Sequence, residues 1–141
     1  MDTINLQFVR PDRVLYQGEV AGLTLVTPSG ELGVWPQHDP QVVALGFGEV
    51  RLNMLEEKGG GIVSVMVSGG YAEIENDNVI ILADSACRAD QIEVEAVRST
   101  REAAMADLAF LDNDDSRRAY YENKIRWCDL LLKHALEEEE L

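Results

Sequence analysis

Several ingredients of metalloenzymes and membrane-spanning proteins are scarce in this sequence. Only 2 histidines and 2 cysteines occur among its 141 residues, and Cys87 and Cys128 lie far apart with no CxxC spacing. Such a sparse set predicts neither a metal site nor a disulfide framework. The longest apolar runs, such as 79–83 and 130–132, are much too short to cross a bilayer. GxSxG, HExxH and Walker motifs are also absent, so we predict no catalytic residue.

Positive charge is scarce as well. The 12 Lys and Arg residues stand against 26 Asp and Glu, which gives a formal net charge of −14. Nucleic acid and anionic lipid repel such a surface, so we expect neither nucleic-acid binding nor direct membrane insertion. The first residues lack the basic and apolar regions of a secretory signal. We therefore expect a cytoplasmic protein, or one held at a membrane by protein partners.

Glycine and proline are absent after Arg88, and this absence divides the chain. Before that point, short alternating or β-branched runs are separated by turn residues at roughly ten-residue spacing, which is typical of an antiparallel sandwich or barrel. These runs are 4–8, 14–16, 23–27, 50–54, 62–67 and 79–82.

The last third of the chain has the pattern of two amphipathic helices. The expected apolar stripe of the first is Val94, Val97, Met105, Leu108 and Leu111. That of the second is Tyr121, Ile125, Cys128, Leu132 and Ala135. Between them, the segment 112–116 supplies a turn and helix-capping side chains. So short a connection predicts an antiparallel hairpin.

Two segments of the first part carry most of the functional information. Residues 29–40, SGELGVWPQHDP, combine glycines and prolines with an acid and a histidine. So many glycines and prolines are incompatible with a helix, and they predict a rigid loop containing a short strand. Residues 67–73, VSGGYAE, predict a strand with a Gly-Gly kink. A stiffened loop usually presents its side chains to a partner, so Glu31 and His38 are candidate contact residues.

These segments resemble one known family. GELGVWPQHDP is similar to the GELGILPGHAPL segment of the epsilon subunit of F-type ATP synthases, VSGGYAEI to its VSGGFLEV, and NVIILADSA to its NVTVLADTA. The similarity covers residues 4–92 in order, and the helical tail is similar in architecture and length. The resemblance implies an all-β N-terminal domain over 1–88, a flattened antiparallel β-sandwich of about ten short strands, and a two-helix regulatory hairpin over 89–141.

The resemblance also implies a function without catalysis. Such subunits lie in the central rotor stalk, on the cytoplasmic side of the bacterial cell membrane, and couple ion flow through the c-ring to rotary ATP synthesis. Their partners are the gamma subunit and the c-ring. Glu31 and His38 match the acid and histidine that lie, in the family, at the foot that meets the c-ring.

The hairpin of the family can open, extend toward the catalytic alpha and beta subunits and restrain ATP hydrolysis. Candidate regulatory contacts here are the basic side chains Arg117, Arg118, Lys124 and Arg126. The target of these cations in the family is acidic. It would repel the acids of the hairpin, which are Glu122, Asp129 and the run 137–140. Because a surface ion pair contributes only about 0–1 kcal/mol, we expect weak or absent inhibition.

Some family members bind ATP through an I/L-D-x-x-R-A motif at the first helix. The matching positions are Ile92, Glu93, Ala96 and Val97, so the phosphate-pairing arginine is missing. We therefore expect no bound nucleotide and no other cofactor.

Two other classes of protein are the alternatives to this family. One is a free-standing β-sandwich binding module with a dimerising helical hairpin, which would purify without a gamma subunit. The other is a small cupin-like enzyme, which needs a metal cluster that two separate histidines cannot provide.

Overall fold

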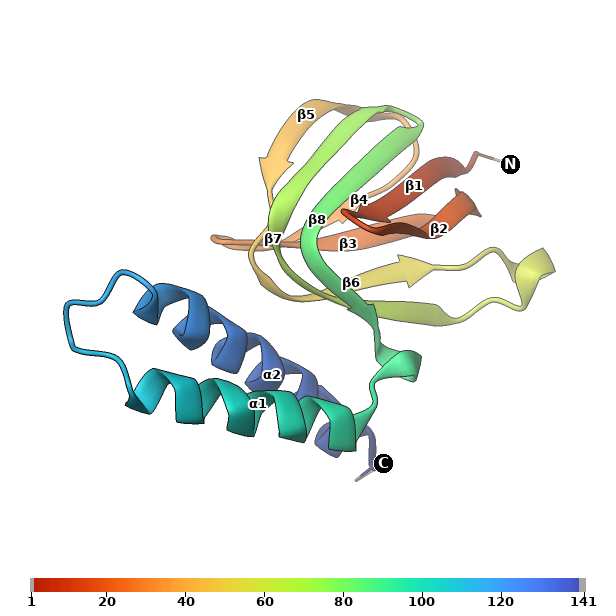
Figure 1. Ribbon diagram of the computed structural model, residues 1–141. Helices are drawn as coiled ribbons and strands as arrows, with labels where there is room; N and C mark the ends of the chain where they lie inside the picture. The colour runs from red at the N-terminus through yellow and green to blue at the C-terminus, as the bar shows by residue number, and fades with distance from the viewer. Residues whose placement is uncertain (1, 140–141) are drawn as a thin grey trace. The chain divides into compact units, whose positions relative to one another are not determined.

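The computed structural model describes residues 2–139. The chain divides into two compact units, with the boundary between Asp90 and Gln91. Within the described residues, the first unit contains eight strands and the second contains two α-helices (Figure 1). The strands are β1 Ile4–Arg10, β2 Arg13–Val20, β3 Gly22–Thr27, β4 Gly30–Val34, β5 His38–Ala44, β6 Phe47–Asn53, β7 Ile62–Asn76 and β8 Asn78–Arg88.

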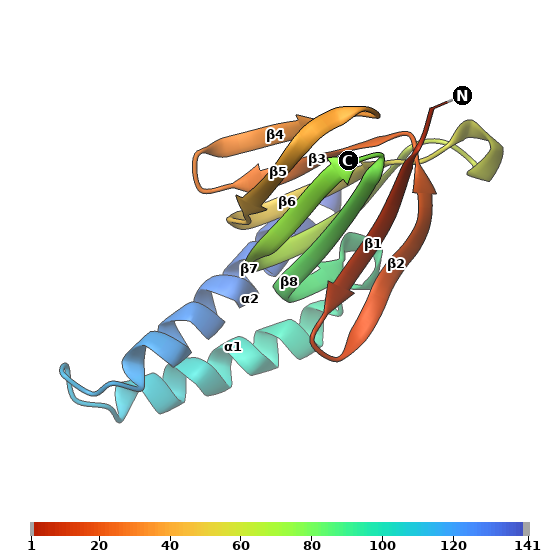
Figure 2. The ribbon, with the colours of Figure 1, turned by 90° about the horizontal axis from the view of Figure 1, so that it is seen from above.

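The strands form one continuous hydrogen-bonded path that folds over on itself. Its order is β2-β1-β8-β7-β6-β3-β4, and β5 pairs with β7 beside this path. Most neighbours are antiparallel, whereas β1 and β8 are parallel. Figure 2 shows β5, β7, β8, β1 and β2 side by side, with β3 and β4 in the other layer.

A bend in the long strand β7 creates the two layers. Its first half pairs with β6 and its second half with β5, while β8 accompanies both halves. Gly69 and Gly70 lie at the bend, with φ angles of 72° and 119°. A Cβ atom on Gly70 would lie 2.1 Å from the carbonyl oxygen of Leu82, so only glycine fits there. The Gly-Gly kink expected from the sequence is therefore the point where the sheet folds over.

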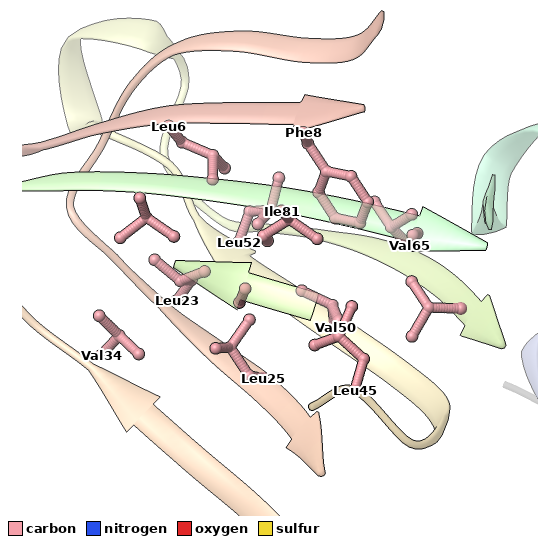
Figure 3. Packing of buried hydrophobic residues seen from close by; sticks show 14 of the residues in the cluster. Leu6, Phe8, Leu23, Leu25, Val34, Leu45, Val50, Leu52, Val65 and Ile81 are labelled. Atoms are coloured by element: carbon pink, nitrogen blue, oxygen red, sulfur yellow. The ribbon is translucent and has the colours of Figure 1, made fainter. Parts of the chain in front are cut away.

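The core lies between the two layers and is built by alternation along each strand. In β1, Ile4, Leu6 and Phe8 are buried, and the residues between them are exposed. Side chains from both layers interdigitate in Figure 3. The labelled members are Leu6, Phe8, Leu23, Leu25, Val34, Leu45, Val50, Leu52, Val65 and Ile81. Each fully buried side chain of this size contributes about 1.5–3 kcal/mol, so this cluster dominates the stability of the unit.

The structure confirms the β-sandwich and corrects one detail of the prediction. The described chain has eight strands, roughly the expected number, and β7 and β8 each run through the bend and serve both layers. The sandwich is not wholly antiparallel, since Asn5 to Val9 of β1 run parallel to Asn78 to Leu82 of β8. Parallel neighbours require a long connection, and almost the whole domain lies between these two strands.

The second unit is the predicted helical hairpin. Helix α1 covers Val94–Ala109 and helix α2 covers Arg118–Glu139, so the last two residues of the chain lie outside the described part. Two short 3-10 helices, Glu56–Lys58 and Ala89–Gln91, lie elsewhere. Among the described residues, neither helix has the length and apolar character that a bilayer crossing needs.

The interior of the hairpin differs in detail from the predicted stripes. Its buried residues are Ala104, Cys128 and Leu131, whereas Met105 is 46% exposed. Leu131 is buried and the predicted Leu132 is only half-buried, since a helical face defined by spacing alone is uncertain by one position at its rim.

Candidate functional site

Glu31 lies on β4, next to the turn that joins it to β3. It is in register with Val26, and Gly30 is in register with Thr27 at the end of the hairpin. The Glu31 side chain is 56% exposed, and its Oε2 atom pairs with Nη2 of Arg51 on β6. The predicted contact residue is thus held by a basic side chain two strands away.

Arg51 lies between two acids on the outer surface of the sheet. Besides Glu31, it contacts Glu49, with 3.4 Å between Nη1 and Oε1. The pKa of Arg51 is raised above its ordinary value, first by the hydrogen bond to Glu31 and then by Glu49. The guanidinium is therefore a permanent cation that joins two carboxylates.

His38 begins β5 and follows a residue in the left-handed conformation. Gln37 has a φ of 66°, and its backbone N–H donates a 2.7 Å hydrogen bond to Oδ1 of Asp77. Nδ1 of His38 lies 2.7 Å from the carbonyl oxygen of Asp39. Because a carbonyl only accepts, Nδ1 carries the proton and Nε2 is the acceptor in the neutral ring. The hydrogen bond from Gln37 to Asp77 ties the start of β5 to the β7–β8 turn.

Trp35 lies between the two predicted contact residues. Its ring covers Gly22 so closely that a Cβ atom there would come within 2.4 Å of the ring. The indole is nevertheless 56% exposed, so one face packs on the sheet and the other faces solvent. This gives the segment 29–40 an apolar surface beside its acid and its histidine.

The structure does not bring Glu31 and His38 together. Glu31 is next to the β3–β4 turn, whereas His38 is in register with Asn76 next to the β7–β8 turn. These two turns lie apart in both views (Figure 1, Figure 2). A single partner that used both residues would have to extend along the loop and strand between them.

The candidate regulatory cations lie along α2 and before its first turn, and all four already have partners. Arg117 pairs with Asp115 at 2.8 Å, and Arg118 pairs with Glu122 at 3.4 Å. The ammonium of Lys124 lies 5.5 Å from the centroid of the Tyr120 ring. The fourth cation, Arg126, is exposed on α2.

The turn before α2 is stabilised by one aspartate. Oδ1 of Asp115 accepts hydrogen bonds from the backbone N–H of Arg117 at 2.9 Å and from its Nε at 3.1 Å. The Arg117 side chain lowers the pKa of Asp115 to about 2. This carboxylate forms the turn predicted for the segment 112–116, but its bond goes to Arg117, which precedes α2, and not to an N–H of the helix as a helix cap would.

A further ion pair joins the two helices. Nε of Arg101 on α1 lies 2.5 Å from Oδ1 of Asp129 on α2. Near the helix connection, a groove of about 410 Å³ is lined by both helices. Its lining residues include Met105, Leu108 and Ile125, so these predicted apolar residues face one another within the hairpin.

The four positions that correspond to the ATP motif surround the start of α1. Ile92 precedes the helix, and Glu93 is its N-cap without a side-chain capping bond. Ala96 is exposed and Val97 is half-buried. The nearby Arg98 pairs with Glu95 at 3.0 Å. Within residues 2–139, His, Cys, Asp and Glu side chains form no group of three or more that could hold a metal ion.

Comparison with known proteins links these features to one family. Residues 3–89 match the family model "ATP synthase, Delta/Epsilon chain, beta-sandwich domain". The ATP synthase epsilon chain of Halalkalibacterium halodurans is 40% identical over 121 residues, which are 84% of this chain and 88% of the relative. That of Bacillus pumilus is 35% identical over 136 residues, 96% of this chain and 94% of the relative.

A solved structure extends this similarity to the fold. A chain in the Euglena gracilis mitochondrial ATP synthase, solved as OSCP/F1/c-ring, has a TM-score of 0.72 and 27% identity. The alignment covers 96% of this chain and 82% of that one, so it includes both the sandwich and the hairpin.

Proposed function

Because this chain belongs to the family of ATP synthase epsilon chains, we propose that it works in the central stalk of an F-type ATP synthase and couples ion flow through the c-ring to rotary ATP synthesis. The observation that carries this proposal is the similarity to bacterial epsilon chains over nearly the whole chain, sandwich and hairpin together. A free-standing binding module would not require both units to match.

The proposed role is mechanical and involves no catalytic residue of this chain. The β-sandwich binds the gamma subunit and presents the segment 29–40 to the c-ring. Three features support this assignment: Glu31 is exposed and held by Arg51, the His38 loop is fixed by Asp77, and Trp35 offers an apolar face. A surface whose side chains are already ordered loses little conformational entropy on binding.

The proposed location is the cytoplasmic side of a bacterial membrane, where protein partners hold the subunit peripherally. The bacterial relatives support a bacterial enzyme. The net charge of −14 opposes direct contact with anionic lipid, so the attachment is assigned to the gamma subunit and the c-ring.

Purification with and without the gamma subunit tests this function. The full chain and the gamma subunit of the same organism are co-expressed, and the masses of the complexes are measured by light scattering. We expect a stable one-to-one complex that survives dilution. A homodimer that ignores the gamma subunit would contradict the proposal and support the free-standing module instead.

The hairpin is proposed to inhibit ATP hydrolysis weakly or not at all. Extension would have to separate Arg101 from Asp129 and expose Ala104, Cys128 and Leu131. It would also have to free Arg117 from Asp115 before that cation could meet an acidic partner. Each such surface pair contributes at most about 1 kcal/mol, so the acids of the hairpin offset what its cations gain.

Removal of the hairpin tests this regulatory proposal. A chain that ends at Arg88 is compared with the full chain in the reconstituted complex, and ATP hydrolysis is measured. We expect hydrolysis to rise by less than about fivefold, the factor that corresponds to 1 kcal/mol. A much larger rise would show that the hairpin is a strong inhibitor.

A further inference from the structure

Arg51 reaches Glu31 across an intervening strand. Thr24 of β3 is in register with Arg51 on one side and with Gly33 on the other. Glu31 lies two residues before Gly33 and therefore on the same face of β4. The Arg51 side chain thus crosses β3 diagonally to contact the Glu31 carboxylate, an arrangement that only a long side chain can make.

The two ends of this contact differ in exposure. The Arg51 side chain is 35% exposed and that of its second partner, Glu49, is 27% exposed, whereas that of Glu31 is 56% exposed. Arg51 is therefore the more covered end of the ion pair, and Glu31 is the more exposed end. Two nitrogens of one planar guanidinium make the two contacts, Nη2 to Glu31 and Nη1 to Glu49, which fixes its orientation more firmly than a single contact would.

We propose that Arg51 is the positioning residue of the c-ring contact, and that it holds the Glu31 carboxylate toward the ring. This inference rests on the proposed function, which assigns Glu31 to that contact. The bond to Arg51 uses Oε2, and a carboxylate has a second oxygen that accepts hydrogen bonds. The group on the ring that meets Glu31 must then be a hydrogen-bond donor or a cation.

Glu49 gives the arrangement a second property. When Glu31 turns toward a donor on the ring, the Arg51 guanidinium keeps an acidic partner, because Glu49 lies on its own strand two residues away. The charge of Arg51 therefore stays paired whether or not Glu31 is bound to it.

A double-mutant cycle tests the inference in the complete complex. Glu31→Gln, Arg51→Met and the double variant are each added to ATP synthase depleted of this subunit, and the binding affinity and the ATP-driven proton pumping are measured. We expect Glu31→Gln and Arg51→Met each to weaken binding about two- to fivefold, the range for one exposed ion pair. The double variant should bind no more weakly than Glu31→Gln alone, because Arg51 acts through Glu31.

Two further variants separate positioning from a merely structural role. Arg51→Lys keeps the charge but loses the planar fork, so its affinity should lie between those of the unsubstituted chain and Arg51→Met. Glu49→Gln removes the second carboxylate that orients the guanidinium but leaves the contact between Arg51 and Glu31 in place, so its affinity should fall less than that of Arg51→Met. Thermal unfolding of each isolated variant shows whether the fold is intact.

The possible failures of the two proposals are distinguishable. If Glu31→Gln weakens binding while Arg51→Met does not, Arg51 has no positioning role and the ring contact stands. If the effects of the two substitutions add, Arg51 acts independently of Glu31 and the inference is wrong. If Glu31→Gln binds like the unsubstituted chain, the proposed ring contact fails and this inference fails with it.

Discussion

At the scale of single residues, the conformation of the segment 29–40 depends on backbone angles as much as on side-chain chemistry. Gln37, just before His38, adopts a φ of 66°, a conformation that strains every residue with a Cβ atom. The similar family segment, GELGILPGHAPL, has glycine at this position. The hydrogen bond from the Gln37 N–H to Asp77 shows how the structure holds the strained residue in place.

We predict that Gln37→Gly stabilises the protein. The left-handed conformation costs a side-chain-bearing residue about 1–2 kcal/mol, and the greater freedom of glycine in the unfolded chain removes about 0.5–1 kcal/mol of the gain. A net increase of up to about 1.5 kcal/mol in the free energy of unfolding is expected, measured as a higher midpoint of denaturant unfolding. Gln41→Gly in β5 is the matched control and should lower the midpoint. Equal losses in both variants would contradict the prediction.

The sequence could identify Glu31 and His38 but not the residues that hold them. Arg51 is separated from Glu31 by twenty positions, and their contact depends on the register of two strand pairs. Asp77 is forty positions from Gln37 and meets it only because β5 pairs with the end of β7. Local patterns contain neither relation, since register is decided by the packing of the whole sheet.

At the scale of secondary-structure elements, the bend in β7 decides the architecture. We predict that Gly70→Ala lowers the free energy of unfolding by more than about 2 kcal/mol, because the new methyl group would meet backbone atoms of β8 and the φ of 119° is strained for alanine. Gly33→Ala is the control, since its nearest atom would be 3.4 Å away on Trp35. Chemical denaturation measures both variants, and similar losses would rule out the backbone clash as the cause.

The sequence predicted the secondary-structure elements better than it predicted how they pair. Alternation and turn residues predicted the strands other than β5, whose first residues were expected in a loop, and the Gly-Gly pair predicted the bend. The parallel pairing of β1 with β8 could not be foreseen, because it joins segments from opposite ends of the domain. In the helices, spacing alone placed Leu132 in the interior, whereas Leu131 is buried.

At the scale of the whole molecule, the hairpin has the two helices expected for the family, but Ala96 stands where the family's ATP motif has arginine. We predict that the full chain does not bind ATP with submillimolar affinity in a calorimetric titration. Ala96 offers no cation to a triphosphate, and the nearest arginine, Arg98, is paired with Glu95. A helix rotates about 200° over two residues, so Arg98 also points away from the motif face.

A gain-of-function variant makes this prediction sharper. Ala96 is exposed, so Ala96→Arg introduces a guanidinium at the motif position without disturbing the interior of the hairpin. ATP should bind this variant more tightly than the unsubstituted chain. Submillimolar binding by the unsubstituted chain itself would contradict the explanation.

The continuous pairing of β7 with β8 gives the sandwich a particular mechanical character. The ladder runs from Glu75 opposite Asn78 to Val65 opposite Arg88, passing through the bend between the layers. A force applied along these strands loads many hydrogen bonds in parallel, because antiparallel bonds lie perpendicular to the strand direction. Sliding of β7 along β8 would have to break many of these bonds at once, so their pairing ties the layer that contains β5 to the layer that contains β6.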